Sequence, residues 1–223
     1  MSYAVIDCPQ RSDAWRLARV GRVTSSRSDA VSDFLKSGVE SAKRRDYKFQ
    51  LVCETLTGRP QDSEYVNDDM RRGIELEPEA IMRYELHANQ IVQTVGFLAH
   101  ADVMAGASLD GYVGAFDGVI EAKAPRPANH LKYLRAGAVP AEHRAQLVHA
   151  LWICGAAWAD FISYCPAFPS PLDLFVVRLA RDEREIRAHA DAVRAFLAEV
   201  QTELDAVRTL AHLSGQLAAS VTA

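Results

Sequence analysis

The first 90 residues are dominated by segments whose apolar positions recur at helical spacing. We predict helices at residues 14–19, 27–36, 41–57 and 66–89. The second would begin at Ser26, which is spaced from Asp29 as in a capping box, and Gly58 would end the third. Pro78 lies inside the fourth and cannot donate a backbone hydrogen bond, so we expect a kink or a new helix there.

From residue 91 onward, short apolar runs separated by glycines replace the helical spacing. We predict strands at 91–95, 108–113 and 118–123, helices at 127–136 and 140–154, strands at 159–165 and 172–180, and a long charged helix at 182–212. Helices, then a β-meander, then alternating elements indicate an α/β fold of mixed character, in which a mixed β-sheet is flanked by helices. A length of 223 residues without internal repeats suits a single domain, residues 1–223.

The composition is typical of a soluble globular protein, with 49% hydrophobic and 24% charged residues. No run approaches the roughly 18 apolar residues of a membrane helix, and the N-terminus does not resemble a secretory signal. We therefore expect a cytoplasmic protein without a membrane partner. The cysteines form no CxxC pair, which argues against a zinc ribbon or an iron–sulfur cluster and predicts buried free thiols: Cys8, Cys53, Cys154 and Cys165.

The charge is unevenly distributed along the chain. The net charge is −4, yet residues 1–60 hold 11 Lys/Arg against 7 Asp/Glu, and the remainder holds 14 against 22. This asymmetry permits nucleic-acid binding by the N-terminal part, although a solvated basic surface has the same composition.

The predicted strand 118–123 carries the residues with the clearest chemical potential. Alternation places Glu121 and Lys123 on the same face. Asp110 ends the preceding strand, and a hairpin would bring its carboxylate beside Glu121, giving the pattern D-x10-E-x-K. Two carboxylates are the hard oxygen ligands that Mg²⁺ or Mn²⁺ prefers, and the carbonyl of Ala122 can add another.

This arrangement suits phosphodiester hydrolysis. A divalent ion polarises the phosphoryl oxygen and lowers the pKa of a bound water. Lys123 would position or help deprotonate that water, or neutralise charge in the transition state. An acid-x-lysine strand on its own is usually a solvated sheet face or an exposed ion pair, and Asp110 at the right distance makes the catalytic interpretation stronger. Asp117 suits a turn residue before Gly118.

Two segments of the chain resemble the active-site motif of the PD-(D/E)xK nuclease superfamily, namely Asp110-Gly111 and Glu121-Ala-Lys123-Ala-Pro125. Other segments narrow the resemblance to the lambda exonuclease and YqaJ-like viral recombinase family: Trp15-x3-Arg19-x-Gly21-x2-Thr24-x-Ser26, Gly73-x3-Glu77-Pro-x-Ala80-x3-Tyr84 and Ala145-Gln146-x5-Trp152. This family resemblance implies a restriction-endonuclease-like core.

The resemblance also implies a role for each motif residue. Mg²⁺ or Mn²⁺ would be bound by Asp110, Glu121 and the Ala122 carbonyl, with Glu77 near a second ion. Lys123 would act on the attacking water, and Gln146 would lie beside the scissile phosphate. Arg19 and Ser26 would hold the 5′-phosphate of the DNA end. A predicted helix start at Ser26 is consistent with anion binding. Two positions depart from the family pattern: His143 replaces a common Tyr, and Leu109 replaces a frequent Pro. We interpret His143 as a neutral surface or groove histidine.

The activity implied is metal-dependent 5′→3′ degradation of one strand of linear double-stranded DNA, which leaves a 3′ overhang for a single-strand annealing protein. A ring-shaped homotrimer is implied as well. Two alternatives remain open, namely a structure-specific or restriction-like endonuclease on the same fold and a catalytically inactive DNA-end-binding protein. Digestion of linear but not closed circular duplex separates the exonuclease from the endonuclease.

Overall fold

The computed structural model describes residues 3–61 and 67–221, with side chains described as far as residue 210. The N-terminal part contains β1 (Tyr3–Ile6), α1 (Asp13–Arg19), β2 (Val23–Thr24), the 3₁₀ helix η1 (Ser25–Ser32), α2 (Ala42–Thr57) and α3 (Asp68–Ala88). It is followed by β3 (Phe97–His100), β4 (Ala105–Ala107), β5 (Gly111–Val113), β6 (Gly118–Lys123), α4 (Pro127–Ala136), α5 (Ala141–Cys154), β7 (Trp158–Tyr164), β8 (Leu174–Ala180) and α6 (Glu183–Val221).

The described strands form two four-stranded sheets, ordered β1-β3-β4-β2 and β5-β6-β7-β8. Both are mixed, because β2 pairs with β4 and β6 pairs with β7 in parallel while the other pairings are antiparallel. The prediction of a mixed α/β fold is confirmed, but the single β-meander is wrong. Only the β5–β6 hairpin has that form, and the chain passes from one sheet to the other between β4 and β5.

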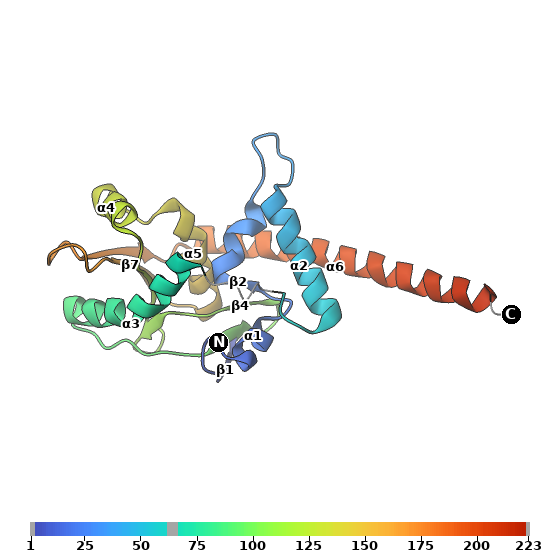
Figure 1. Ribbon diagram of the computed structural model, residues 1–223, viewed down its shortest axis with the longest axis horizontal. Helices are drawn as coiled ribbons and strands as arrows, with labels where there is room; N and C mark the ends of the chain where they lie inside the picture. Colours follow the sequence, from blue (N-terminus) through green and yellow to red (C-terminus); the bar gives the residue numbers. More distant parts are fainter. Residues whose placement is uncertain (1–2, 62–66, 222–223) are drawn as a thin grey trace.

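Helices cover the second sheet on both faces. Ala80 and Tyr84 of α3 pack against Ile120 and Ile162 on one face. On the other face, Val119 belongs to the larger core shared with α5 and α6. Figure 1 shows α3 and α4 at the end of the molecule opposite the tip of α6, which extends well beyond the body. Strand β6 therefore lies inside the sheet, with its two faces turned toward α3 and α5.

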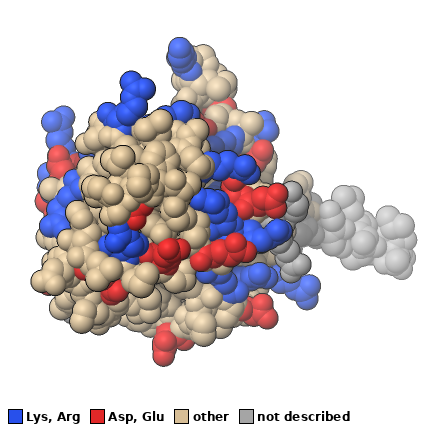
Figure 2. Space-filling view, turned by 60° about the vertical axis from the view of Figure 1, so that its left-hand side comes forward, with Lys and Arg blue, Asp and Glu red and all other residues tan. Residues whose placement is uncertain are grey.

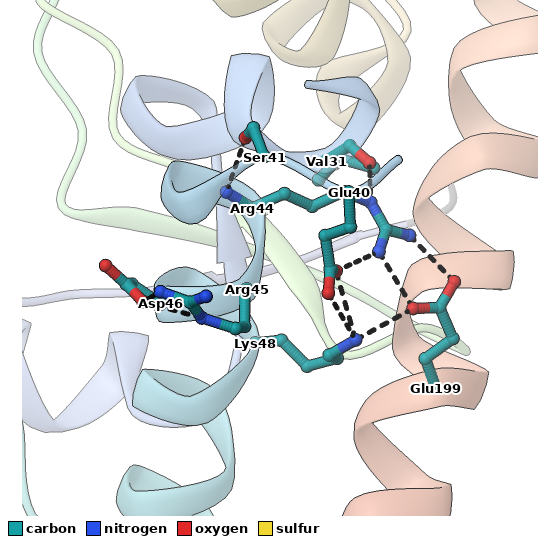
Figure 3. Close-up of polar contacts among 8 residues, drawn as sticks. All are labelled: Val31, Glu40, Ser41, Arg44, Arg45, Asp46, Lys48 and Glu199. Carbon is teal, nitrogen blue, oxygen red and sulfur yellow. Dashed lines mark hydrogen bonds and ion pairs between the residues drawn. The ribbon is translucent and has the colours of Figure 1, made fainter. Parts of the chain in front are cut away.

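An ion-pair network with buried cations joins η1 and α2 to α6. The guanidinium of Arg44 donates to the carbonyl of Val31 over 2.8 Å and to both Glu199 oxygens over 2.7 and 2.8 Å, and it also contacts Glu40. Lys48 bonds the same two carboxylates (Figure 3). Because Arg44 and Lys48 are buried, each needs these acceptors to offset its desolvation. The network anchors the short helix η1 to the body.

Most predicted helices match the observed ones, and the exceptions are instructive. The helix predicted at 27–36 is a 3₁₀ helix at Ser25–Ser32, capped by Thr24 without a side-chain bond, so the capping box is wrong. Helix α3 runs continuously through Pro78, and no second helix starts there. The strand predicted at 91–95 is reduced to one bridge, between Gln93 and Tyr112.

Two further features complete the fold. The four thiols are free, but Cys53 is exposed, contrary to the prediction that all are buried. Among the described residues, no helix has the length and apolar character that crossing a membrane requires.

Candidate active site

The register of the β5–β6 hairpin places two carboxylates opposite each other. Gly111 pairs with Ile120, so Asp110 lies one step beyond the last pair, opposite Glu121. The Oδ2 atom of Asp110 accepts a hydrogen bond of 2.8 Å from the backbone N–H of Ala122. In a strand, the carbonyl of a residue points to the same edge as its N–H, so the Ala122 carbonyl also faces this edge. The arrangement predicted from the D-x10-E-x-K spacing is present.

Glu121 is the most enclosed of these groups, with 5% of its surface exposed. Its Oε1 atom contacts the ammonium of Lys123, two residues along the same strand face. The same oxygen accepts a hydrogen bond of 2.6 Å from Nε2 of Gln146 on α5. Because α5 covers this face of the sheet, it brings Gln146 to Glu121 across 25 residues of sequence.

The site concentrates negative charge in a desolvated place. Burial and the charge of Asp110 raise the pKa of Glu121 to about 7, although Lys123 opposes the shift. Burial alone would lower the pKa of Lys123, but the charges of Glu121 and Asp110 outweigh burial and raise it. Lys123 is therefore a cation at neutral pH, whereas Glu121 exchanges a proton there.

Glu77 approaches from the other side, on α3. Its Oε2 atom bonds Nη2 of Arg11 over 2.6 Å. Burial and the charge of Asp110 raise its pKa, while Arg11 opposes the shift. Asp110 and Glu77 thus affect each other electrostatically, although 33 residues separate them in sequence.

The segment that links the two sheets carries a second contact group. Ser108 precedes Asp110 by two residues, with buried Leu109 between them. The Ser108 hydroxyl accepts hydrogen bonds from Nε1 of Trp15 over 2.8 Å and from Nη1 of Arg19 over 3.5 Å. The guanidinium of Arg19 also lies 4.1 Å from the centre of the Trp15 ring. This linker therefore joins the N-terminal motif to the carboxylates.

The start of η1 differs from the prediction. Ser26 is exposed and is the second residue of the 3₁₀ helix rather than its cap. Ser25, which sequence reasoning missed, is buried, and its hydroxyl has no hydrogen-bond partner among the described residues. A buried hydroxyl at a helix start beside an arginine is suited to receive an anion.

All eight predicted residues line one pocket of about 620 Å³: Arg19, Ser26, Glu77, Asp110, Glu121, Ala122, Lys123 and Gln146. The same pocket also brings in residues that sequence reasoning did not single out, among them Arg11, Ser25, Ser108, Asn129, Tyr133 and Arg126. The structure therefore places the carboxylates and the N-terminal motif around one cavity.

His143 lies at the edge of this pocket. Its ring stacks on Phe161, with centroids 5.1 Å apart, and Nε2 lies 3.4 Å from the hydroxyl of Tyr133. Burial and the charge of Lys123 lower the pKa of His143 to about 4. The interpretation of His143 as a neutral groove residue agrees with this environment.

The residues present are compatible with a divalent ion. Across the described residues, no three His, Cys, Asp or Glu side chains surround one metal position. Mg²⁺ is commonly held by only one or two carboxylates and completes its shell with water and substrate phosphate. Asp110, Glu121 and the Ala122 carbonyl suit such a site, and their crowded negative charge would be relieved by a cation.

Comparison with known proteins assigns the family. Residues 14–157 match the model of the YqaJ-like viral recombinase domain. The chain belongs to the YqaJ-like viral recombinase family. Its match includes every motif residue from Trp15 to Trp152 on which the resemblance rested, and no curated protein matches the sequence significantly.

Solved structures agree with this membership. The alkaline exonuclease LHK-Exo from Laribacter hongkongensis is 35% identical, covers 90% of this chain and 98% of its own, and superposes with a TM-score of 0.81. The structure of LHK-Exo in complex with dAMP is 36% identical, covers 91% of this chain and 100% of its own, and superposes with a TM-score of 0.81. A phage-related exonuclease from Haemophilus somnus 129PT, 15% identical with 82% and 96% coverage and a TM-score of 0.61, shares the fold.

Proposed function

We propose that this YqaJ-like chain is a Mg²⁺-dependent exonuclease that degrades the 5′-ended strand of linear double-stranded DNA. The observation that carries the proposal is that one pocket is lined both by the carboxylates around Glu121 and by Arg19 and Ser25, which are suited to hold a terminal phosphate. The similarity to LHK-Exo over nearly the whole chain supports exonuclease chemistry. Mn²⁺ would be an alternative ion because it accepts the same oxygen ligands.

Asp110, Glu121 and the Ala122 carbonyl would hold the ion, and Glu77 would lie near a second one. When bound, a divalent ion polarises the phosphoryl oxygen and lowers the pKa of a bound water. Lys123, held as a cation by the carboxylates, stabilises charge that develops on the phosphate and positions the water. Gln146 fixes the orientation of the Glu121 carboxylate and presents its amide to the pocket.

The direction of degradation follows from the place where the terminal phosphate of the DNA would bind. Arg19 can form charge-assisted hydrogen bonds to a terminal phosphate, and Ser25 supplies a buried hydroxyl that lacks a partner. Ser26 adds its exposed hydroxyl at the pocket edge. A 5′-phosphate held there places the first phosphodiester bond near Asp110 and Glu121, and repeated cleavage leaves a 3′ overhang.

Two partners follow from this proposal. The 3′ overhang is the substrate of a single-strand annealing protein, which would act on the product. A homotrimer would surround the duplex and keep it near the pocket.

The test uses linear duplex labelled at either the 5′ or the 3′ end. Wild-type protein in Mg²⁺ should release mononucleotides from 5′ ends and leave closed circular duplex intact. EDTA should stop the reaction, and Asp110→Asn should abolish it while retaining the thermal unfolding midpoint within a few degrees. Cleavage that persists in EDTA contradicts the metal mechanism.

The same assay separates the alternatives. Linearisation of closed circles would favour the restriction-like or structure-specific endonuclease. Binding of duplex ends without release of nucleotides in either Mg²⁺ or Mn²⁺ would favour the inactive end-binding protein. Among the residues that a dead site would be expected to lose, Glu121 and Lys123 are both present and in contact.

A further inference from the structure

A small hollow next to the candidate active site gathers arginine side chains. Its lining includes Arg16, Arg19, Arg22, Arg27, Tyr47 and Glu54. Arg19 also lines the large pocket, so the two hollows adjoin. On the face seen in Figure 2, basic and acidic side chains are interleaved rather than separated. Against this mixed background, the hollow is a local concentration of positive charge.

Arg22 and Arg27 are partly buried, and neither forms an ion pair with any residue in the described part of the chain. The guanidinium of Arg27 lies 4.7 Å from the centre of the Tyr47 ring. Burial lowers the pKa of Arg22, with no carboxylate opposing the shift. A partly desolvated guanidinium without an anionic partner is an unused donor group.

Glu54 forms no ion pair with Arg22 or Arg27 in the part of the chain that the structure describes. Among the described residues that line the hollow, Glu54 is the acidic one, and 4% of its surface is exposed. Its oxygens accept hydrogen bonds from the backbone N–H of Gly21 over 2.8 Å and from Nε2 of Gln50 over 2.9 Å. They also accept one of 3.3 Å from the backbone N–H of Gln61. The carboxylate is therefore committed to amide donors.

The floor of the hollow is rigid. The hydroxyl of Tyr47 accepts a hydrogen bond of 3.2 Å from the backbone N–H of Thr24, and the buried Tyr47 ring stacks on Phe196 of α6 at 5.7 Å. Arg22 and Arg27 flank Thr24 in sequence, so the same short segment holds both. Preorganised guanidinium groups bind phosphate at a smaller entropic cost than mobile lysines do.

We propose that Arg22 and Arg27 form a second anion site, which binds a backbone phosphate of the DNA duplex beside the terminal-phosphate pocket. The inference rests on the proposed function, because it takes DNA as the substrate. The hollow has a volume of only about 10 Å³, so the phosphate binds at its mouth rather than inside. This contact keeps the duplex near the pocket after each terminal nucleotide has left.

The experiment measures the salt dependence of DNA binding. Anisotropy of a labelled 5′-hydroxyl duplex is recorded in EDTA over a series of KCl concentrations for wild type, Arg22→Gln and Arg27→Gln. Loss of one phosphate contact reduces the slope of log affinity against log salt by about 0.9. Arg22→Lys keeps the charge and should retain most of the slope. Arg45→Gln is the matched control, since Arg45 is exposed and pairs with Asp46 over 3.1 Å.

Unchanged slopes in both glutamine variants, with unfolding midpoints equal to that of wild type, would overturn the proposal. An effect equal to that of Arg45→Gln would do the same, because it would reflect net charge alone. Stabilisation by inorganic phosphate that Arg22→Gln removes, with DNA slopes unchanged, would identify a free-anion site and also overturn it. The proposed function is tested separately by the preference of the wild-type protein for 5′-phosphorylated over 5′-hydroxyl ends.

Discussion

The Nε2 atom of Gln146 donates a 2.6 Å hydrogen bond to Oε1 of Glu121, the same oxygen that Lys123 contacts. Two donors on one oxygen leave Oε2 directed elsewhere, which suits a carboxylate that also binds a metal ion. Gln146→Ala should therefore lower metal affinity or turnover about 10- to 100-fold, as is usual for groups that orient a metal ligand. The measurement is the Mg²⁺ dependence of kcat/KM. Wild-type values in this variant would show that the hydrogen bond has no role in catalysis.

Replacement of Lys123 tests the proposed role of this side chain in cleavage of the phosphodiester bond. Lys123→Ala should retain DNA binding but lose about 10²- to 10⁴-fold in turnover, because the cation acts on the water and on developing charge. The rate is measured at saturating Mg²⁺ and DNA, and the control is Lys132→Ala, since Lys132 is an exposed residue of α4. Turnover within a few-fold of wild type would show that Lys123 only holds Glu121 in place.

The pKa of Glu121 predicts the acid limit of activity. Burial and the charge of Asp110 raise this pKa to about 7 in the metal-free protein, so the carboxyl is increasingly protonated below that pH and cannot ligate. Cleavage at fixed Mg²⁺ should thus fall as the pH drops through about 7. A higher Mg²⁺ concentration should move this fall in activity to lower pH, because the cation competes with the proton for the carboxylate. If activity fell at the same pH at all Mg²⁺ concentrations, protonation of Glu121 would not be its cause.

Duplex ends with a 5′-phosphate should be degraded faster than 5′-hydroxyl ends. A charge-assisted hydrogen bond contributes about 1.5–3 kcal/mol, or roughly 10- to 150-fold, and Arg19→Ala should remove most of that difference. Ser25→Ala should weaken the preference because the buried hydroxyl lacks another partner, and Ser26→Ala should do so as well. Linear duplexes that differ only at the 5′ end provide the comparison. Equal wild-type rates on both ends would remove all three residues from phosphate binding.

The fold itself should be sensitive to acid through a histidine pair. His149 Nδ1 lies 3.0 Å from His189 Nε2, and His149 Nε2 lies 3.2 Å from the Gly106 carbonyl, so the two rings cannot both be protonated without losing the bond between them. Burial lowers the pKa of His189 to about 4 and that of His149 well below its usual value. Because the unfolded rings take up protons first, stability present above about pH 6.5 should be lost as the pH falls toward 4.

His189→Gln keeps an amide donor without a titrating ring, so it should reduce this loss, by at most about 1.4 kcal/mol per pH unit. The measurement is the urea midpoint at several pH values, and His87→Gln, exposed on α3, is the control. Identical pH profiles for wild type and His189→Gln would show that other groups cause the acid sensitivity.

Strand β6 could be predicted because the pattern that determines it is local. Alternation along Gly118–Lys123 determines that Glu121 and Lys123 share a face, and the hairpin spacing places Asp110 opposite. The first sheet could not be predicted, since its strands span only two to four residues and include a Gly and several Ala that lack strand propensity. Its stability comes from long-range pairing that no local pattern records.

The helix start after Thr24 was predicted in the right segment, but not its type or its first residue. The segment forms a 3₁₀ helix that begins at Ser25, whose hydroxyl is buried, while Ser26 is exposed and lines the pocket. The contact of Arg11 with Glu77 spans 66 residues and depends on how α3 packs, so sequence spacing carries no sign of it.

The ion pairs around Arg44 also make the shape of the pocket depend on α6. Glu199 provides two of the acceptors for Arg44 and one for Lys48, and it lies on α6, 155 residues from Arg44. Arg44 also donates to the carbonyl of Val31 in η1, the helix that carries Ser25 and Ser26. The distant helix α6 therefore helps to position two residues that line the pocket.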